Sequence, residues 1–360
     1  MQRIKDLQKL LKEKRVSSFL ITHRPNLKYL FNFYGTRGMA LVTQKQAFFL
    51  TDARYFNEIK RILPKNVKAI EIEKNLQELW VKFVKKLKIK KCHFEENYMT
   101  VAQLKFFKKA TRGIEFKGVQ NLAEEIRAIK DSKEIEYTKK SQEINEKTLK
   151  EVLKNLKIGI TEKEISTLIK VYGLKFNADE TSFKPIVAFG KNSAIPHHEC
   201  DETKLKKGDT VLIDMGMKFK GYCSDMTRTF FFKSKPTKLQ EKIYNLVLSA
   251  QEKTILNARA KMTGKHVDNF ARKMIEKAGY GKNYTHSGGH GIGLEIHEIP
   301  STNQEYKDKF PSNCIITVEP GIYIENFFGV RIEDMIILDS HGNNKNLTKM
   351  PKNLKSAIIP

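Results

Sequence analysis

The sequence contains little cysteine and no long apolar run, and both absences narrow the classes of protein it can encode. The four cysteines among 360 residues are scattered and form no CxxC pair, so we expect no disulfide framework. No run approaches the roughly 18 apolar residues that a membrane-spanning helix needs. The first residues also lack the short apolar core and the cleavage site of a signal peptide. We therefore expect a cytoplasmic protein in a reducing compartment, with no membrane partner.

Acidic residues are scarce relative to basic ones. The 41 aspartates and glutamates face 66 lysines and arginines, which gives a formal net charge of +25. Such a charge is typical of proteins that bind nucleic acid. The excess is mostly lysine on helical stretches such as 82–91, and zinc-finger spacing, RRM-type aromatic motifs and KH-type GxxG loops are missing. We therefore predict a solvated lysine-rich surface and do not expect nucleic acid as the main partner.

The length and the pattern of apolar residues predict two domains. Residues 1–125 alternate helical and strand patterns and contain no cluster of catalytic residue types. A helical stretch at 121–157, free of proline and glycine, links them to the second part. We place the domains at 1–125 and 126–360. Seven of the nine histidines lie in the second domain, and five of these are candidates for a site: His197, His198, His286, His290 and His297.

Two acids occupy a predicted β-hairpin at 211–230, "VLIDMGMKFKGYCSDMTRTF", where apolar residues are normal. Asp214 and Asp225 lie on opposite arms. With a two-residue loop at Phe219-Lys220 they would be directly opposed and would point to the same face. Phe219-Lys220 is a poor turn, however, and Gly221 indicates a longer loop or a bulge. The pattern therefore predicts a shared face for the two acids and leaves the register open.

A second predicted hairpin, at 315–338, repeats this arrangement with Glu319 and Glu333 on its two arms. The repetition indicates an internal duplication in geometry, although the two segments share little sequence. A single acid in a strand usually faces solvent. Four carboxylates close together raise one another's pKa and cannot all stay ionised without a cation. The set therefore favours a cation site over four unrelated surface acids.

The stretch 286–300, "HSGGHGIGLEIHEIP", combines three histidines with four glycines. The glycines let the backbone approach a site closely. Histidines at this density favour a ligand or acid–base role over a buried structural role. The stretch lacks GxxxxGK[ST] and does not read as strand–GxGxxG–helix, so a phosphate cradle is the weaker interpretation.

Four motifs in this order, "IDMGMKFKGYCSDMTRTF", "HSGGHGIGLEIHE", "TVEPGIY" and "GVRIEDM", resemble those of the pita-bread metallopeptidases. That family includes Xaa-Pro aminopeptidases, Xaa-Pro dipeptidases (prolidases) and methionine aminopeptidases. The segments "NLKYLFNFYGTRGMALVT" and "TDARYF" are similar to the creatinase-type N-terminal domain, which methionine aminopeptidases lack. The resemblance implies an α/β (α+β) two-domain fold. Its parts would be a creatinase-like N-terminal domain and a pita-bread catalytic domain with an internal pseudo-duplication.

The resemblance also implies a set of site residues. Asp214 would bind one metal ion and His290 and Glu319 the other, with Asp225 and Glu333 bridging both. Besides Glu319, the catalytic residues would be histidines that line the substrate side: His197, with His198 as a weaker candidate, His286 and His297. Arg331, two residues before Glu333, would contact the ligands and not the metal ions themselves.

This donor set of oxygens and one imidazole favours two divalent ions, with Mn²⁺ first and Co²⁺, Fe²⁺ or Zn²⁺ as alternatives. Such ions lower the pKa of water and polarise a scissile carbonyl. Glu319 would shuttle the proton, while His197 and His297 would hydrogen-bond the substrate carbonyl and the developing tetrahedral intermediate.

We therefore predict a metal-dependent hydrolase with a peptide substrate, acting as a homodimer. It would be a metallo-aminopeptidase that releases an N-terminal residue preceding proline. The alternatives are a prolidase, which cleaves only Xaa-Pro dipeptides, and a metal-free relative that binds peptide or nucleic acid.

Overall fold

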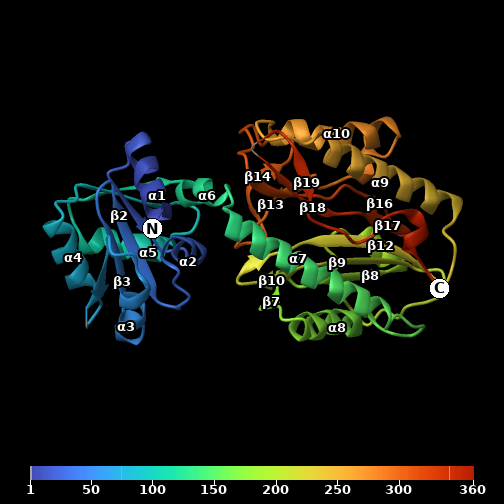
Figure 1. The fold of residues 1–360 in the computed structure, drawn as a ribbon, viewed down its shortest axis with the longest axis horizontal. Coiled ribbons are helices and arrows are strands. Elements are labelled where there is room, and N and C mark those ends of the chain that lie inside the picture. Colours follow the sequence, from blue (N-terminus) through green and yellow to red (C-terminus); the bar gives the residue numbers. More distant parts are fainter. Residues whose placement is uncertain (1, 74, 340) are drawn as a thin grey trace. The chain divides into compact units, whose positions relative to one another are not determined.

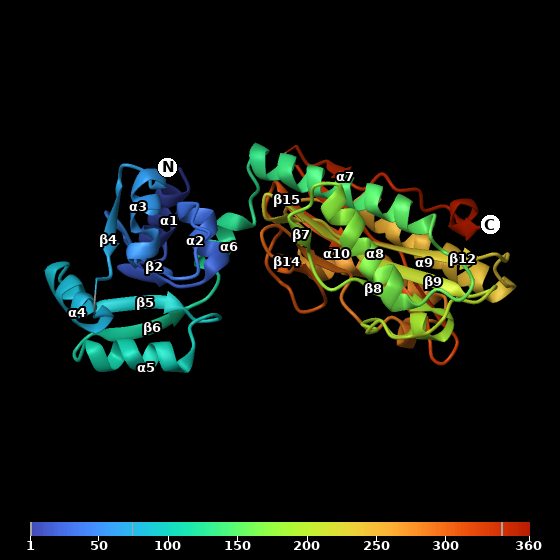
Figure 2. The same ribbon diagram turned by 90° about the horizontal axis from the view of Figure 1, so that it is seen from below.

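A computed structural model describes residues 2–73, 75–339 and 341–360, which fall into two compact units, 1–127 and 128–360. We call them the N-terminal and C-terminal units and treat each by itself (Figures 1 and 2). In the described part of the chain, no helix combines the length and apolar character that a membrane crossing requires.

The N-terminal unit is built around a mixed sheet whose described strands follow the order β4-β3-β2-β1-β5-β6. Only β2 runs antiparallel to its neighbours in this sheet. The strands are β1 (Ser18–Ile21), β2 (Gly38–Thr43), β3 (Ala47–Thr51), β4 (Val67–Glu71), β5 (Lys91–Glu95) and β6 (Glu115–Val119). The helices are α1 (Gln2–Glu13), α2 (Arg24–Phe31), α3 (Ala53–Ile62), α4 (Leu76–Lys86), α5 (Val101–Ala110) and α6 (Leu122–Arg127).

The short apolar runs of the N-terminal unit form strands because helices cover the sheet and bury them. β1 and β3 are buried along their whole length, as expected for strands under helices. On one face, Leu20, Leu41 and Leu50 belong to a core cluster with Trp80 of α4 and Phe107 of α5. The alternation of helices and strands expected in residues 1–125 is therefore present.

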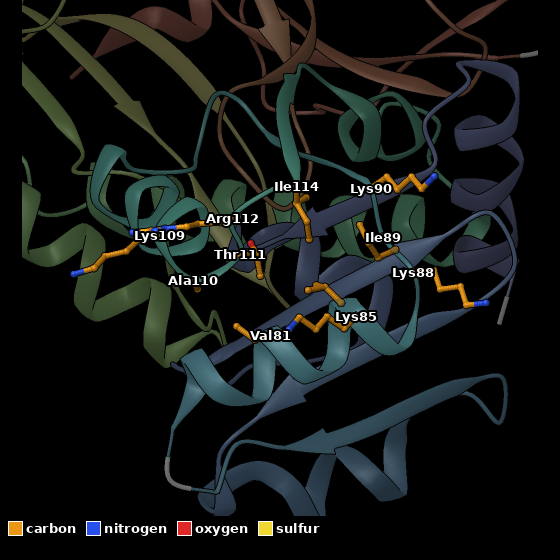
Figure 3. A pocket seen from close by; sticks show the side chains of 12 residues that line it. Val81, Lys85, Lys88, Ile89, Lys90, Lys109, Ala110, Thr111, Arg112 and Ile114 are labelled. Carbon is orange, nitrogen blue, oxygen red and sulfur yellow. The ribbon is translucent and has the colours of Figure 1, made fainter.

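A pocket of about 560 Å³ lies where α4 and α5 end (Figure 3). The described residues that line it include no acid and five exposed cations, Lys85, Lys88, Lys90, Lys109 and Arg112. Lysines in the last turn of a helix are stabilised by its free carbonyl groups. Lys85 and Lys109 occupy such positions, so the helix ends explain them without an anionic partner.

The C-terminal unit contains two successive segments, each a helix pair followed by strands. The first has α7 (Ser132–Leu153), α8 (Glu162–Lys175), β7 (Glu180–Thr181), β8 (Ile186–Phe189), the 3₁₀ helix η1 (Gly190–Ala194), β9 (Thr210–Met215), β10 (Met217–Phe219), β11 (Tyr222–Cys223) and β12 (Met226–Phe232). The second has α9 (Lys238–Asn257), α10 (Gly264–Lys277), η2 (Gly281–Asn283), β13 (Gly289–Gly291), β14 (Glu298–Thr302), β15 (Cys314–Val318), β16 (Gly321–Ile324), β17 (Phe328–Arg331) and β18 (Asp334–Leu338). The chain ends with β19 (Asn344–Asn346), η3 (Leu354–Ala357) and β20 (Ile358–Ile359).

Strand β12 shows how the two helix pairs enclose the sheets of this unit. Phe230 and Phe232 pack in one core cluster with residues of α7 and α8, while Phe231 packs in another with residues of α9 and α10. Neighbouring side chains of a strand point to opposite faces, so the helix pairs cover opposite sides of β12. Figure 1 shows the strands between α8 on one side and α9 and α10 on the other.

The first hairpin has a different register from the one in which the two acids are directly opposed. Asp214 pairs with Thr227 in the β9–β12 ladder, and Phe219 pairs with Tyr222 in the β10–β11 ladder. The turn is therefore Lys220-Gly221, with φ of 52° and 78°. Positive φ at both central residues is the hairpin turn that matches the twist of the strands. Asp214 and Asp225 are therefore not directly opposed, because the chain turns at Lys220-Gly221 and not at Phe219-Lys220.

The second hairpin keeps one register through two ladders. Val318 pairs with Asp334 in the β15–β18 ladder, and Gly321 pairs with Arg331 in the β16–β17 ladder. Residues 319–320 and 332–333 interrupt the pairing, and Pro320 has no N–H to donate there. The common register places Glu319 opposite Glu333. In both hairpins the acids therefore lie at or beside an interruption of the ladder.

Candidate metal centre

The structure brings the four hairpin carboxylates and His290 into one buried cluster. Arg331 donates from Nη2 to Oδ2 of Asp214 at 2.6 Å, and the Thr227 hydroxyl donates to Oε2 of Glu333 at 2.7 Å. The Thr317 hydroxyl donates to Oε1 of Glu319 at 3.1 Å. A protein donor therefore holds one oxygen on each of these three acids.

Three carboxylate oxygens in the cluster are buried and have no hydrogen-bond partner among the described residues: Oδ1 of Asp214, Oδ1 of Asp225 and Oε1 of Glu333. A buried polar atom without a partner costs roughly 1–3 kcal/mol, and more when it carries charge. Because native proteins pair nearly all such atoms, three in one place require an explanation. A cation between them supplies it.

Burial and mutual repulsion disturb the ionisation of these acids. Burial raises the pKa of Asp225 well above its ordinary value, and the charges of Asp214 and Glu319 raise it further. Burial likewise raises the pKa of Glu333, with the charge of Asp225 as the next cause. In the protein without ions, these groups hold a proton more readily than exposed carboxyl groups do. A bound cation would reverse the preference, because it stabilises the carboxylate form.

His290 is oriented as a metal ligand would be. Its Nδ1 lies 3.1 Å from the carbonyl oxygen of Gly291, which can only accept, so Nδ1 carries the proton. Nε2 is then the ring nitrogen that faces the acids, 3.5 Å from Oδ2 of Asp225 and 3.4 Å from Oε1 of Glu319. Ligating histidines usually donate their other ring N–H to a carbonyl or carboxylate in this way.

The residues present therefore fit divalent metal ions. Asp225, His290 and Glu333 each offer a ligand atom within 4.8 Å of the others. Carboxylate oxygens with one imidazole suit Mn²⁺, Fe²⁺, Co²⁺ or Zn²⁺ and not ions that require thiolate. The orphaned oxygens lie on three of the five expected ligands.

Arg331 connects the ligands to the next layer of residues. It is nearly fully buried, and its Nη1 donates to the phenol oxygen of Tyr323 at 2.7 Å. That oxygen lies 2.9 Å from Nε2 of His286, whose Nδ1 lies 2.8 Å from the carbonyl oxygen of Ser287. His286 therefore carries its proton on Nδ1 and accepts from Tyr323, whose pKa burial raises to about 12. This places His286 beside the cluster without making it a ligand.

His197 and His297 are exposed and form the open side of the site. The rings of His297 and His290 meet edge to face, with centroids 4.4 Å apart. Partial desolvation lowers the pKa of His297, and the charges of His290 and His197 lower it further while the charge of Glu319 opposes them. His297 is thus neutral at neutral pH and can donate from a ring N–H.

His198, the weaker candidate, points elsewhere. It is buried, and its Nε2 lies 2.6 Å from Oε2 of Glu162, at the start of α8. This contact gives it a structural partner outside the cluster.

Sequence reasoning missed Thr227 and Thr317, which donate to Glu333 and Glu319. It also missed Tyr323, which contacts Arg331 and His286. A signal for Thr227 existed, because Asp225, Thr227 and Thr229 are spaced two residues apart and so share one face of an extended chain. Thr317 and Tyr323 occupy ordinary strand positions, and nothing in their spacing distinguishes them.

The chain is similar to known proteins along nearly its whole length. Residues 136–340 match the model of metallopeptidase family M24, and residues 3–129 match that of the creatinase/prolidase N-terminal domain. A Xaa-Pro dipeptidase of Pyrococcus horikoshii is 33% identical over 355 residues, 98% of this chain and 98% of that protein.

Two solved structures are similar along nearly the whole chain. One is a Xaa-Pro dipeptidase from Bacillus anthracis, with 36% identity, 99% of both chains covered and a TM-score of 0.95. The other is an X-Pro aminopeptidase from Thermotoga maritima, with 33% identity, 97% of this chain and 98% of that chain covered, and a TM-score of 0.87. These matches confirm the predicted fold class, with a creatinase-type N-terminal domain and a pita-bread C-terminal domain.

Proposed function

This chain belongs to metallopeptidase family M24, and from that premise we propose that it hydrolyses the bond between an N-terminal residue and a proline in second position. As a member of the family it is a hydrolase of the Xaa-Pro dipeptidase and aminopeptidase group, and the family uses divalent metals. We propose the aminopeptidase activity, in which the substrate extends beyond the proline.

One observation carries the proposal: the orphaned oxygens of Asp214, Asp225 and Glu333 lie in one cluster with His290, whose Nε2 faces Asp225 and Glu319. A creatinase-type chain that had lost its metal and kept only peptide binding would have no reason to bury these groups. The cluster therefore supports a metal-dependent enzyme over a metal-free binding protein.

We propose that Asp214, Asp225, His290, Glu319 and Glu333 hold two divalent ions. Once bound, the ions lower the pKa of water and polarise the scissile carbonyl, which provides a nucleophile at neutral pH. The four carboxylates favour Mn²⁺ among the candidate ions.

The side chains of the protein would then move protons and orient the substrate. Glu319 would take a proton from the attacking water and return it to the proline nitrogen, which has no proton of its own. The Thr317 hydroxyl fixes Glu319 for this role by donating to Oε1. His297 and His197, on the open side, would donate to the carbonyl oxygen as it gains negative charge.

A prolidase activity is the second candidate, because the Bacillus anthracis dipeptidase superposes with a TM-score of 0.95 and the Thermotoga maritima aminopeptidase with 0.87. Both activities break the same type of bond, so they differ in whether the site accepts a residue after proline. Hydrolysis of Gly-Pro and Gly-Pro-Gly, with Mn²⁺ added, separates them. Cleavage of the tripeptide supports the aminopeptidase. Cleavage of the dipeptide alone supports the prolidase, and cleavage of neither refutes the proposal.

We also propose a cytoplasmic location and a homodimer. All four cysteines are free and buried, which supports a reducing compartment. Sedimentation of the purified protein would test the oligomeric state.

A further inference from the structure

Glu162, one of several buried acids outside the metal centre, hydrogen-bonds to both ends of the segment 189–201. Glu162 is the first residue of α8 and is 0% exposed. Its Oε1 accepts from the N–H of Phe189 at 2.8 Å and from Nδ2 of Asn192 at 3.0 Å. Its Oε2 accepts from Nε2 of His198 at 2.6 Å and from the N–H of Asp201 at 3.1 Å. All four donors come from the segment 189–201, so one side chain fastens both ends of it.

The middle of this segment is fastened on the other side, at the metal centre. Arg331, which holds a proposed metal ligand, also donates from Nη1 to the carbonyl oxygen of Pro196 at 3.2 Å. His197 follows Pro196 directly and is itself exposed. The position of His197 is therefore set by two anchors, Glu162 and Arg331.

Arg331 contacts both Oδ2 of Asp214 and the carbonyl oxygen of Pro196, so the residue before His197 lies next to a proposed metal ligand.

We propose that Glu162 is a positioning residue for peptide hydrolysis: it sets the segment 189–201 so that His197 faces the substrate. This inference rests on the function proposed above. A carboxylate suits the role because an ionised carboxylate only accepts hydrogen bonds and has about four lone-pair positions for its four donors. The N-terminus of α8 adds a favourable partial positive charge.

Glu162→Gln tests the proposal with little change in shape. An amide has one acceptor oxygen, and its NH₂ group would face N–H donors, so about half of the contacts are lost. A displacement near 1 Å can cost up to roughly a hundredfold in rate. We expect kcat and kcat/KM on Gly-Pro-Gly to fall together by at least about tenfold, since the interaction acts in the transition state.

A double-mutant cycle with His197→Ala distinguishes positioning from general stabilisation. If Glu162 acts through His197, Glu162→Gln should lower kcat by less than about twofold in the His197→Ala background. If the fall in kcat of the double variant equals the product of the falls in the two single variants, the proposal is overturned. An unchanged kcat in Glu162→Gln would also overturn it. The matched control is Glu164→Gln, in the same turn of α8, whose carboxylate bonds to Thr161 and not to the segment.

A second variant and a second readout cover the remaining outcomes. If Glu162→Gln does not fold, His198→Ala replaces it in the double-mutant cycle. This variant removes one hydrogen bond to Glu162 and leaves the start of α8 unchanged. Absence of coupling between His198→Ala and His197→Ala would also refute the proposal. Hydrogen exchange of the metal-free protein provides the readout without activity. Exchange across 189–201 should rise in Glu162→Gln and not in Glu164→Gln.

The two proposals fail separately. A wild-type protein that cleaves no Xaa-Pro peptide refutes the proposed function, and exchange alone then decides whether Glu162 holds the segment. Unchanged exchange across 189–201 in an active enzyme refutes the role of Glu162 only.

Discussion

Replacing Asp225 with asparagine is expected to shift thermal stability in opposite directions without and with metal. In the metal-free protein the pKa of Asp225 is raised by burial and by the charges of Asp214 and Glu319. A carboxylate whose pKa is higher in the folded than in the unfolded state weakens the fold as pH rises from its unfolded pKa through its folded pKa. Asparagine has nearly the same shape and no charge. At neutral pH, metal-free Asp225→Asn should therefore melt at a higher temperature than metal-free wild type.

Metal reverses this order. An ion at a hundred times its Kd stabilises the folded state by about 2.7 kcal/mol per site. For a unit of the size of residues 128–360, 1 kcal/mol corresponds to roughly 2–4 °C in Tm. Each site is therefore expected to add roughly 5–10 °C. Asp225→Asn would lose at least one such increment, because the amide offers one good donor oxygen in place of two.

Scanning calorimetry of wild type and Asp225→Asn, with excess Mn²⁺ and with chelator, measures whether the order of their melting temperatures reverses. Elemental analysis gives the number of ions bound, and circular dichroism confirms folding. Glu325→Gln is the matched control, an exposed acid in the turn of the second hairpin, expected to stay within about 0.5 kcal/mol of wild type in both states. Equal metal-induced shifts in wild type and Asp225→Asn would refute the reasoning. A metal-free variant that melts below metal-free wild type would also refute it.

Three further predictions follow from the same site. Peptides with alanine in place of proline in second position should be hydrolysed at least about tenfold more slowly than their proline counterparts, as kcat/KM would show. Arg331→Met should destabilise the metal-free protein by about 3–5 kcal/mol in denaturant titrations, because it leaves buried Asp214 without its partner. Metal affinity measured by calorimetry should fall as pH is lowered, since the raised pKa values of Asp225 and Glu333 make protons compete with the ions; equal affinity at acidic and neutral pH would contradict this.

Strands such as β1 and β3 of the N-terminal unit could be predicted because they are short apolar runs, and such runs can be recognised directly in the sequence. The register of the first hairpin could not. The register depends on whether the turn begins at Phe219 or at Lys220. Lys220 has a positive φ, but nothing about a lysine in a sequence indicates that conformation, so only the following Gly221 points to the turn. The charged site residues were visible because their types are rare in buried strands. Of their supports, Arg331 was predicted, whereas the role of Thr227 depends on Glu333, a residue 106 positions away, and a spacing pattern alone does not reveal that contact.

The interruptions of the two hairpins explain how one site can gather acids from both. In an unbroken ladder, opposed residues stay on a flat shared face and each backbone group is paired within its own sheet. At Glu333 the backbone N–H instead donates to the carbonyl oxygen of Thr227, which joins the second hairpin to the first. Gly289 allows a similar approach on the other side: its φ is 151°, and a Cβ there would lie 2.1 Å from the carbonyl oxygen of Thr317. Because that close contact lets the N–H of His290 reach the Thr317 hydroxyl, the imidazole is brought to the acids by backbone geometry. The positions of the proposed ligands therefore depend on places where regular strand pairing stops. A sequence indicates regular strands more clearly than it indicates such interruptions.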